Sequence, residues 1–155
     1  MATWKAFAES APEIAELGLK MLSEHGAAFF LATVRKDGSP RLHPVVPILA
    51  QGKLFVFCGG PKVYDLCSDG RFALHAQIDR DDMEFLIEGR AAFVNDDRTM
   101  RAAVARAAPY KVPDDPADLT HQLFHFDIER AHMTTWFHPG LPDTRPTHTE
   151  WSEHD

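Results

Sequence analysis

A cationic pair beside two glycines is the strongest candidate for chemistry in this sequence. Residues 59–62 read Gly-Gly-Pro-Lys. The glycines let the backbone approach a ligand closely, and the proline sets the first turn of a helix. The exposed N–H groups of that turn attract an anion, and Lys62 adds a positive charge beside them. Arg41 lies on a neighbouring predicted strand, from which its guanidinium would bind two oxygens of a phosphate. A phosphate monoester fits this pattern, although on spacing alone a strand-to-helix turn with two surface cations is the commoner explanation.

The histidines and the cysteine Cys58 give weaker evidence for a functional site than the Arg41 and Lys62 pattern. His121 and His125 have the i, i+4 spacing that binds zinc on a helix. The alternation around them instead predicts a strand, which separates the two side chains by about 13 Å at ~3.3 Å per residue. We therefore expect no metal site. His43 and His75 lie in predicted strands, where a hydrogen-bonded histidine is the expected role. Cys58 ends a strand and faces either a ligand or, as a small buried thiol, the core.

The length and composition of the chain indicate which classes of protein are excluded. The chain has 155 residues, with 16 Lys and Arg against 23 Asp and Glu, and 45% of its residues are hydrophobic. This length predicts one domain. The acidic balance argues against a nucleic-acid partner, and no apolar run approaches the ~20 residues of a membrane span. The start does not resemble a signal peptide, and the two cysteines offer no disulfide framework, so we expect a cytoplasmic location.

The elements that would position these residues are mostly strands. An Asp-Gly pair at residues 37–38 predicts a hairpin between residues 27–34 and 41–49. Ser10 and Glu13 predict a capping box for an N-terminal helix that stops at Gly26. Further strands are predicted over residues 53–57, 71–78, 83–94 and 119–137, helices after Pro61 and over residues 96–108, and a solvated hairpin tip at residues 79–82.

These elements predict a mainly β domain of about six or seven antiparallel strands with peripheral helices. A barrel is the favoured architecture because closure removes exposed edges, and an α+β sandwich is the alternative. The domain is expected over residues 1–137, including the N-terminal helix. Residues 138–155 are rich in proline, threonine and charge, and we expect them to form a polar C-terminal tail.

Several segments together resemble the pyridoxamine 5′-phosphate oxidase-like flavin-binding split barrels. The resemblance covers about residues 27–137, and their order and spacing are the basis of it. The matching segments are 31–47 (Leu-Ala-Thr-Val-Arg-Lys-Asp-Gly-Ser-Pro-Arg-Leu-His-Pro-Val-Val-Pro), 52–57 (Gly-Lys-Leu-Phe-Val-Phe), 61–66 (Pro-Lys-Val-Tyr-Asp-Leu), 71–75 (Arg-Phe-Ala-Leu-His) and 85–91 (Phe-Leu-Ile-Glu-Gly-Arg-Ala). The resemblance implies a split β-barrel and a homodimer, with flavin mononucleotide (FMN) bound in two grooves at the subunit interface.

The resemblance also implies roles for individual residues. Arg41 and Lys62 match the arginine and lysine that grip the FMN phosphate, together with the N–H groups that follow Gly60. Val45 and Val46 would run beside the flavin ring and the ribityl chain and offer backbone hydrogen bonds. The family's usual lysine just after the arginine strand is replaced by valine or proline here, which leaves fewer cations around the flavin.

The remaining matches depart from the family pattern. Phe57 and Cys58 fall where an aromatic residue followed by threonine or serine is usual, and a thiol is a weaker donor than a hydroxyl. Glu84 stands where glutamine is frequent, and an ionised carboxylate cannot donate a hydrogen bond. Trp136 and Arg145 resemble a C-terminal tryptophan and arginine that reach the partner's flavin.

The functional expectation is a flavin-dependent oxidoreductase with an unassigned small-molecule substrate or electron donor. The cofactor would carry the chemistry, which agrees with the lack of any nucleophile motif. The ending lacks the Arg-x-His-x-Arg pattern of true pyridoxamine phosphate oxidases, so the chain looks closer to general stress proteins and flavin/deazaflavin oxidoreductases. The alternatives are a relative that binds the deazaflavin F420 or a tetrapyrrole, and a non-catalytic protein that sequesters flavin. FMN is favoured over F420 because no Lys and Arg cluster suits the long acidic tail of F420.

Overall fold

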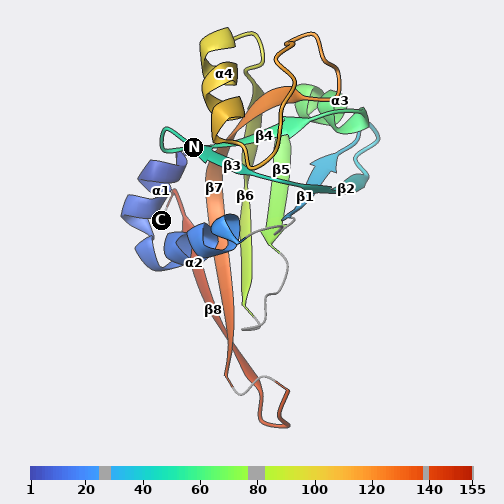
Figure 1. The fold of residues 1–155 in the computed structure, drawn as a ribbon. Helices are drawn as coiled ribbons and strands as arrows, with labels where there is room; N and C mark the ends of the chain where they lie inside the picture. The colour runs from blue at the N-terminus through green and yellow to red at the C-terminus, as the bar shows by residue number, and fades with distance from the viewer. Residues whose placement is uncertain (25–28, 77–82, 138–139, 155) are drawn as a thin grey trace.

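The strands of the chain form one antiparallel sheet. The structure is a computed structural model and describes residues 1–24, 29–76, 83–137 and 140–154. The predicted hairpin tip at residues 79–82 and the helix stop at Gly26 lie outside these ranges. The sheet has eight strands in the order β2-β1-β5-β6-β7-β4-β3, with β8 paired to β7. It does not close on itself, since β2 and β3 stand at its two ends (Figure 1).

The strands are β1 (Phe29–Val34), β2 (Pro40–Val45), β3 (Ile48–Ala50), β4 (Lys53–Cys58), β5 (Arg71–Ala76), β6 (Glu84–Phe93), β7 (Gln122–Phe137) and β8 (Arg145–Ser152). The helices are α1 (Trp4–Ser10), α2 (Pro12–Ser23), α3 (Pro61–Ser68) and α4 (Arg98–Ala107). The predicted mainly β fold with peripheral helices is confirmed, with one more strand than the upper expectation. None of the helices in the described ranges has the length and apolar character to cross a membrane.

The predicted hairpin between β1 and β2 is confirmed. Thr33 stands opposite Arg41 in this antiparallel pair. The turn is stabilised by Asp37, whose Oδ1 accepts hydrogen bonds from the backbone N and the hydroxyl of Ser39. Gly38 adopts a φ of 85°, a conformation that glycine reaches without a steric penalty. The turn therefore sets the register that carries Arg41 to its position.

The predicted strand over residues 41–49 is instead two strands. β2 pairs with β1, whereas β3 pairs with β4 at the other end of the sheet. Pro47 lies between them and has no N–H to continue a ladder. The chain therefore leaves one end of the sheet after Val45 and joins the opposite end at Ile48.

The N-terminal capping box was a wrong prediction. Helix α2 begins after Ala11, which makes no side-chain cap hydrogen bond, and a separate helix α1 ends at Ser10. The Ser10 hydroxyl instead accepts a hydrogen bond of 2.9 Å from the indole nitrogen of Trp151. The oxygen that was predicted to cap the helix is thus used as the acceptor for Trp151, near the C-terminus.

Part of the predicted polar tail is a strand. β8 pairs with β7 along its whole length, from Arg145 opposite Phe137 to Ser152 opposite Arg130. Most β8 side chains are exposed, so the segment lacks the alternation of apolar and polar residues that indicates a strand. Its only large apolar anchor is Trp151, which packs against the main core.

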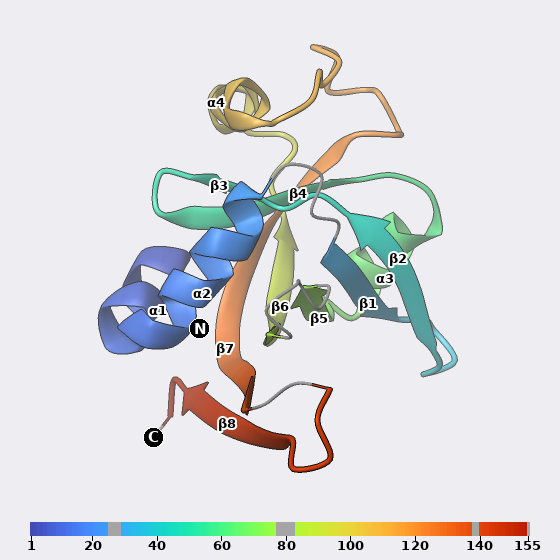
Figure 2. The same ribbon diagram turned by 60° about the horizontal axis from the view of Figure 1, so that its bottom comes forward.

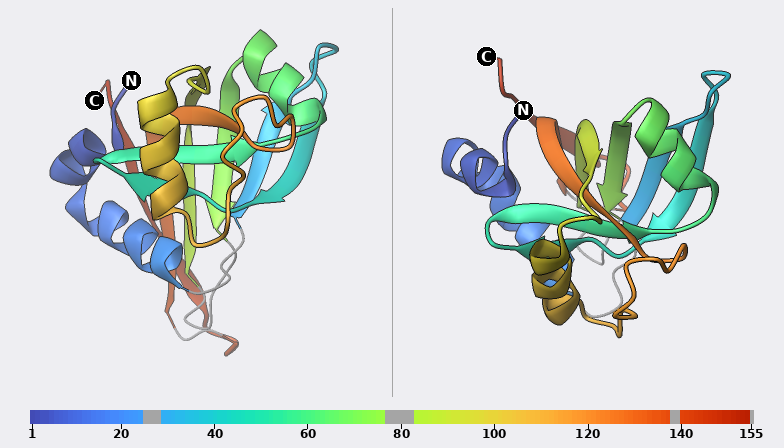
Figure 3. Two further views of the ribbon diagram at one scale, coloured as in Figure 1. Left: turned by 45° about the horizontal axis from the view of Figure 1, so that its top comes forward. Right: turned by 90° about the horizontal axis from the view of Figure 1, so that it is seen from above.

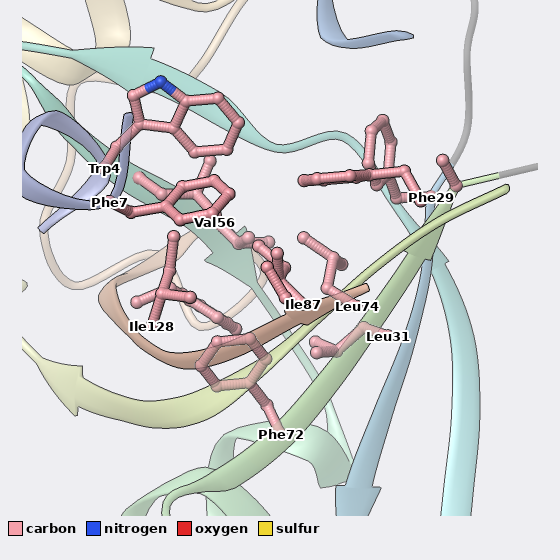
Figure 4. Packing of buried hydrophobic residues seen from close by; sticks show 14 of the residues in the cluster. Trp4, Phe7, Phe29, Leu31, Val56, Phe72, Leu74, Ile87 and Ile128 are labelled. Atoms are coloured by element: carbon pink, nitrogen blue, oxygen red, sulfur yellow. The ribbon is translucent and has the colours of Figure 1, made fainter. Parts of the chain in front are cut away.

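Two apolar clusters hold the fold together, one on each side of β4. The main core fills the space between the sheet and helices α1 and α2, and Figure 4 shows Trp4 and Phe7 above Val56, Ile87 and Ile128. The second cluster lies under α4, which covers the β3–β4 side of the molecule (Figure 3). Because successive residues of a strand point to opposite faces, β4 contributes Leu54, Val56 and Cys58 to the main core and Phe55 and Phe57 to the second cluster.

Candidate functional site

Arg41 is held by a buried carboxylate of α3. Its Nε donates a hydrogen bond of 2.7 Å to Asp65 Oδ2, and the Thr33 hydroxyl donates one of 2.8 Å to the same oxygen. The Asp65 side chain is 7% exposed, whereas that of Arg41 is 23% exposed. This contact joins α3 to the β1–β2 hairpin. Arg41 was predicted from the sequence as a site residue, whereas Asp65 and Thr33, which lie 24 and 8 positions away from it, were not.

The first turn of α3 contains Lys62, whose charge acts on His43 of β2. Helix α3 begins at Pro61, and its N-cap residue Gly60 has a φ of 67° and offers no side-chain cap. Pro61 has no backbone N–H, and that of Val63 donates to the carbonyl oxygen of Gly60 over 3.1 Å. In the described part of the chain, the N–H of Lys62 is therefore the donor that the start of this turn leaves for an anion. A side chain at Gly60 would meet open space.

Gly59 has a different role from the one predicted for it. A Cβ atom at this position would lie 2.6 Å from the carbonyl oxygen of Thr120. The glycine therefore permits a close approach of the chain's own backbone. Of the two glycines, only Gly60 faces free space where a ligand would approach.

His43 lies near Arg41 and Lys62, and its environment differs from the one predicted from the sequence. Its Nε2 atom is shielded from solvent and has no hydrogen-bond partner in the described part of the chain, contrary to the expected hydrogen-bonded histidine. Burial lowers the pKa of His43, and the nearby charges of Lys62 and Arg41 lower it further. His43 is therefore a neutral imidazole beside two cations.

Cys58 lies at the end of β4 on the side of the main core. It is fully buried, and burial raises the pKa of its thiol to about 12, although Lys62 opposes that shift. The thiol is consequently protonated at neutral pH. This environment matches the small buried thiol, one of the two roles left open by the sequence, and it excludes a thiolate nucleophile.

Strand β2 forms one edge of the sheet and carries the predicted contacts along its length. Arg41, His43 and Val45 share its inward face, while Val46, which follows the strand, is 38% exposed. Arg41 and Val45 are four positions apart, about 13 Å along the strand at ~3.3 Å per residue. Because β2 pairs with β1 alone among the described strands, the outer edge of its backbone is left for other hydrogen bonds.

Phe57 does not join this group. Its ring lies in the second cluster, on the face of β4 opposite Cys58, and the Arg101 guanidinium lies 5.1 Å from the ring centre. Phe57 is 7% exposed. The alternation of side chains along β4 therefore directs Phe57 and Cys58 to different environments, although they are adjacent in sequence.

Glu84, Trp136 and Arg145 lie at the other end of the molecule. Glu84 begins β6 opposite Thr134, and Trp136 and Arg145 belong to the β7–β8 hairpin. This hairpin extends away from α3 and the β1–β2 hairpin (Figures 1 and 2). Within one chain these three residues are not brought to Arg41 and Lys62. Their predicted contact with the flavin of a partner subunit stays a prediction.

The two histidines with metal-like spacing have separate partners. His121 precedes β7 and its Nδ1 lies 2.9 Å from Asp118 Oδ2, whereas His125 lies within β7 with its Nε2 3.4 Å from Asp127 Oδ1. The predicted strand through His125 is confirmed. In the described ranges, no three residues among His, Cys, Asp and Glu form a group that would hold a metal ion.

Comparisons with known proteins identify the fold. No family model and no curated protein sequence matches the chain. A protein from Clostridium acetobutylicum, related to general stress protein 26 of Bacillus subtilis and described as of the pyridoxinephosphate oxidase family, has a similar structure. Its TM-score is 0.62 at 13% identity, and the match covers 97% of this chain and 96% of that one.

Two further structures show the range of ligands on this fold. A pyridoxamine 5′-phosphate oxidase-related, FMN-binding protein from Nostoc punctiforme matches with a TM-score of 0.62 at 11% identity, over 94% of this chain and 96% of that one. A heme-binding protein from Mycobacterium smegmatis matches with a TM-score of 0.52 at 16% identity, over 78% of this chain and 52% of that one. The expectation from the sequence is confirmed at the level of fold: the chain adopts the split-barrel fold of the pyridoxamine 5′-phosphate oxidase-like proteins.

Proposed function

We propose that this chain binds FMN and acts as a flavin-dependent oxidoreductase, working as a homodimer. The observation that carries the proposal is the contact of Arg41 with Asp65 of α3, the helix whose first turn contains Lys62. The charges of Arg41 and Lys62 both act on His43 of β2, which places the two cations near each other. These groups come from segments that the fold alone brings together. They offer a phosphate two cations and the backbone N–H of Lys62.

Strand β2 extends beyond Arg41 and is long enough to contact the rest of a ligand whose phosphate is bound at Arg41. The strand runs from Arg41 at the α3 end to Val45 at the other, and none of the described strands pairs with its outer edge. A phosphate bound at Arg41 would leave the ribityl chain and the ring to follow the strand toward Val45 and Val46. The FMN-binding protein from Nostoc punctiforme supports this choice of ligand on the same fold.

In this proposal the flavin supplies the hydride or electron chemistry, and the protein binds and orients it. The protonated state of Cys58 agrees with a site in which no thiolate takes part. The lowered pKa of His43 favours its neutral form, so this residue adds no third positive charge beside Arg41 and Lys62. None of the charged residues around Arg41 and Lys62 indicates which substrate would be used.

The dimer is part of the proposal because one chain separates the predicted contacts. Trp136 and Arg145 lie on the β7–β8 hairpin, far from Arg41 and Lys62 of the same chain. In a two-fold assembly the hairpin of one subunit would complete the site of the other. Sedimentation at micromolar protein should give a dimer, and a monomer would argue against this arrangement.

The cofactor is tested by fluorescence titration of FMN. We expect Arg41→Ala and Lys62→Ala each to weaken FMN binding about tenfold or more, equivalent to at least ~1.4 kcal/mol. Lys36→Ala is the matched control, because Lys36 is an exposed cation on the adjacent β1–β2 turn. Binding of riboflavin, which lacks the phosphate, should change little in any variant. Wild-type protein that fails to bind FMN, or variants that bind it equally well, would overturn the proposal.

Catalysis is tested separately from binding. Addition of NADH or NADPH to the FMN-loaded protein should bleach the visible flavin absorbance, which air or an added acceptor should restore. A flavin that is bound tightly but is reduced by no donor would instead identify a protein that sequesters FMN.

A tetrapyrrole ligand is the second candidate. It is supported by the heme-binding protein from Mycobacterium smegmatis, which has a similar structure. His43 would supply an imidazole, a group that ligates haem iron, but its shielded Nε2 would first have to become exposed. Titration with hemin would then produce a Soret shift that His43→Ala abolishes, and FMN would not compete. F420 is distinguished from FMN by direct competition in the same fluorescence titration.

A further inference from the structure

Asp65 is a buried carboxylate that contacts Arg41 of the candidate phosphate site. Burying a carboxylate is costly unless it is both paired with a positive charge and hydrogen-bonded. Asp65 meets both conditions, because its Oδ2 accepts hydrogen bonds from Thr33 and from the Nε of Arg41. Thr33 is itself 2% exposed and lies on β1, in the interior of the sheet. The hydrogen bond from Thr33 therefore holds Asp65 in place, and Asp65 in turn restricts the position of Arg41.

The contact with Asp65 uses only one nitrogen of the Arg41 guanidinium. The five N–H groups of a guanidinium lie in one plane, so a hydrogen bond at Nε restricts the directions in which Nη1 and Nη2 point. No residue in the described ranges accepts a hydrogen bond from those two nitrogens. An arginine that is already oriented loses less conformational freedom when it binds an anion.

We propose that Asp65 is a positioning residue that presents Nη1 and Nη2 of Arg41 to the ligand phosphate. By this action Asp65 makes the site select phosphorylated over non-phosphorylated flavin. The inference rests on the proposed function, since it concerns the phosphate end of that site. It adds a residue that touches no ligand and acts through Arg41.

The change in FMN affinity when Asp65 is removed distinguishes a positioning role from a role in charge balance. If Asp65 were only a counterion of Arg41, its removal would raise the net positive charge of the site and strengthen phosphate binding. If Asp65 positions Arg41, its removal weakens phosphate binding in spite of the gained positive charge. The two roles therefore predict opposite changes in FMN affinity.

The test is a titration of Asp65 variants with FMN and with riboflavin. Asp65→Ala should weaken FMN binding about tenfold, or ~1.4 kcal/mol, and leave riboflavin binding unchanged. Asp65→Asn should restore affinity close to wild type, because its amide oxygen can still accept from both Thr33 and Arg41. Asp65→Glu keeps the charge but displaces the carboxylate by one methylene, so it should weaken FMN binding. It also serves as the decisive variant if Asp65→Ala does not fold.

Two controls isolate the contact with Arg41. Asp69→Ala removes a carboxylate that pairs with Arg71 at the C-terminal end of the same helix, and FMN affinity should not fall. Thr33→Val removes the other hydrogen bond to Asp65 and leaves the Arg41 contact, so it measures the effect of loosening β1 from α3 alone. In an Arg41→Ala background, Asp65→Ala should cause no further loss of FMN affinity.

Several outcomes would overturn the positioning role. These are tighter FMN binding by Asp65→Ala, unchanged binding by Asp65→Glu, an equal loss of riboflavin affinity, or an additive loss in the Arg41→Ala background. In each case the proposed function survives as long as Arg41→Ala itself weakens FMN binding. If wild-type protein does not bind FMN, both the proposed function and this inference fail.

Discussion

The guanidinium of Arg101 lies 5.1 Å from the centre of the Phe57 ring, on the face of β4 opposite the candidate phosphate site. Arg101 is 4% exposed although it lies on α4. Its nitrogens donate to the Asn95 side-chain oxygen and to the backbone carbonyls of Pro113, Asp115 and His121. One buried arginine thus joins α4, the Phe57 ring and the loop that leads into β7.

We expect Arg101→Ala to destabilise the fold without affecting FMN binding. Its removal leaves buried acceptors without a donor, at a cost of about 1–3 kcal/mol in the free energy of unfolding. Urea denaturation measures that loss, and FMN titration of the same sample measures affinity. A loss of FMN affinity at unchanged stability would instead place the Phe57 face in the ligand site.

The two adjacent glycines should respond differently to alanine. Gly60→Ala meets no neighbouring atom but must adopt a φ of 67° with a ψ of −154°, a conformation found almost only for glycine, which costs about 1–3 kcal/mol. Gly59→Ala should cost more, because its Cβ would lie 2.6 Å from a backbone oxygen of Thr120 and the backbone must move. Thermal unfolding of both variants tests this order. Equal melting temperatures would show that the contact with Thr120 relaxes without cost.

The two cysteines should differ in reactivity. Cys58 is buried and its pKa is raised to about 12, whereas Cys67 is exposed, although partial burial also raises the pKa of its thiol. Since the thiolate is the reactive form, a thiol reagent at pH 8 should modify one cysteine in the native protein and the second only after unfolding. Cys67→Ser should abolish the native reaction. Its persistence in that variant would mean that Cys58 is accessible.

Stability should fall as the pH is lowered below about 6.5. Burial is the largest cause that lowers the pKa of both His43 and His125 from the ordinary value of 6.5. For His43, Lys62, Arg41 and Arg35 act in the same direction and Asp65 opposes them. For His125, Lys53 adds to the shift and Asp127 opposes it.

The sign follows from proton binding. The unfolded chain binds more protons than the folded chain once the pH drops below 6.5, so acid favours unfolding. The stabilisation is complete above the unfolded pKa and is lost as the pH falls toward the lowered pKa values. Denaturation midpoints from pH 7.5 to 5.5 test this, and His43→Gln should reduce the slope. A midpoint that stays constant over this range would contradict the burial of both rings.

Local features of the fold could be predicted from the sequence because their causes are local. The Asp-Gly turn that joins β1 and β2 depends on Asp37 and Ser39, which are two residues apart. Helix α4 begins after Asp97 because that side chain accepts a hydrogen bond from the backbone of Met100. In both cases the residues that define the structure are within a few positions of each other.

Features that depend on distant partners were decided by the tertiary structure. Ser10 carries the pattern of a helix cap, but Trp151, 141 positions later, takes its hydroxyl oxygen. Strand β8 forms because β7 offers it an edge, and its own largely exposed residues show no strand pattern.

The candidate site shows the same division. The sequence by itself determined which cations are present, since Arg41 follows a hairpin turn and Lys62 follows a glycine pair. Only the fold decided that Asp65, on a helix after β4, would meet Arg41 and Thr33 on the β1–β2 hairpin. A buried carboxylate cannot be recognised from sequence, because its stability depends on partners that the packing of helix against sheet supplies.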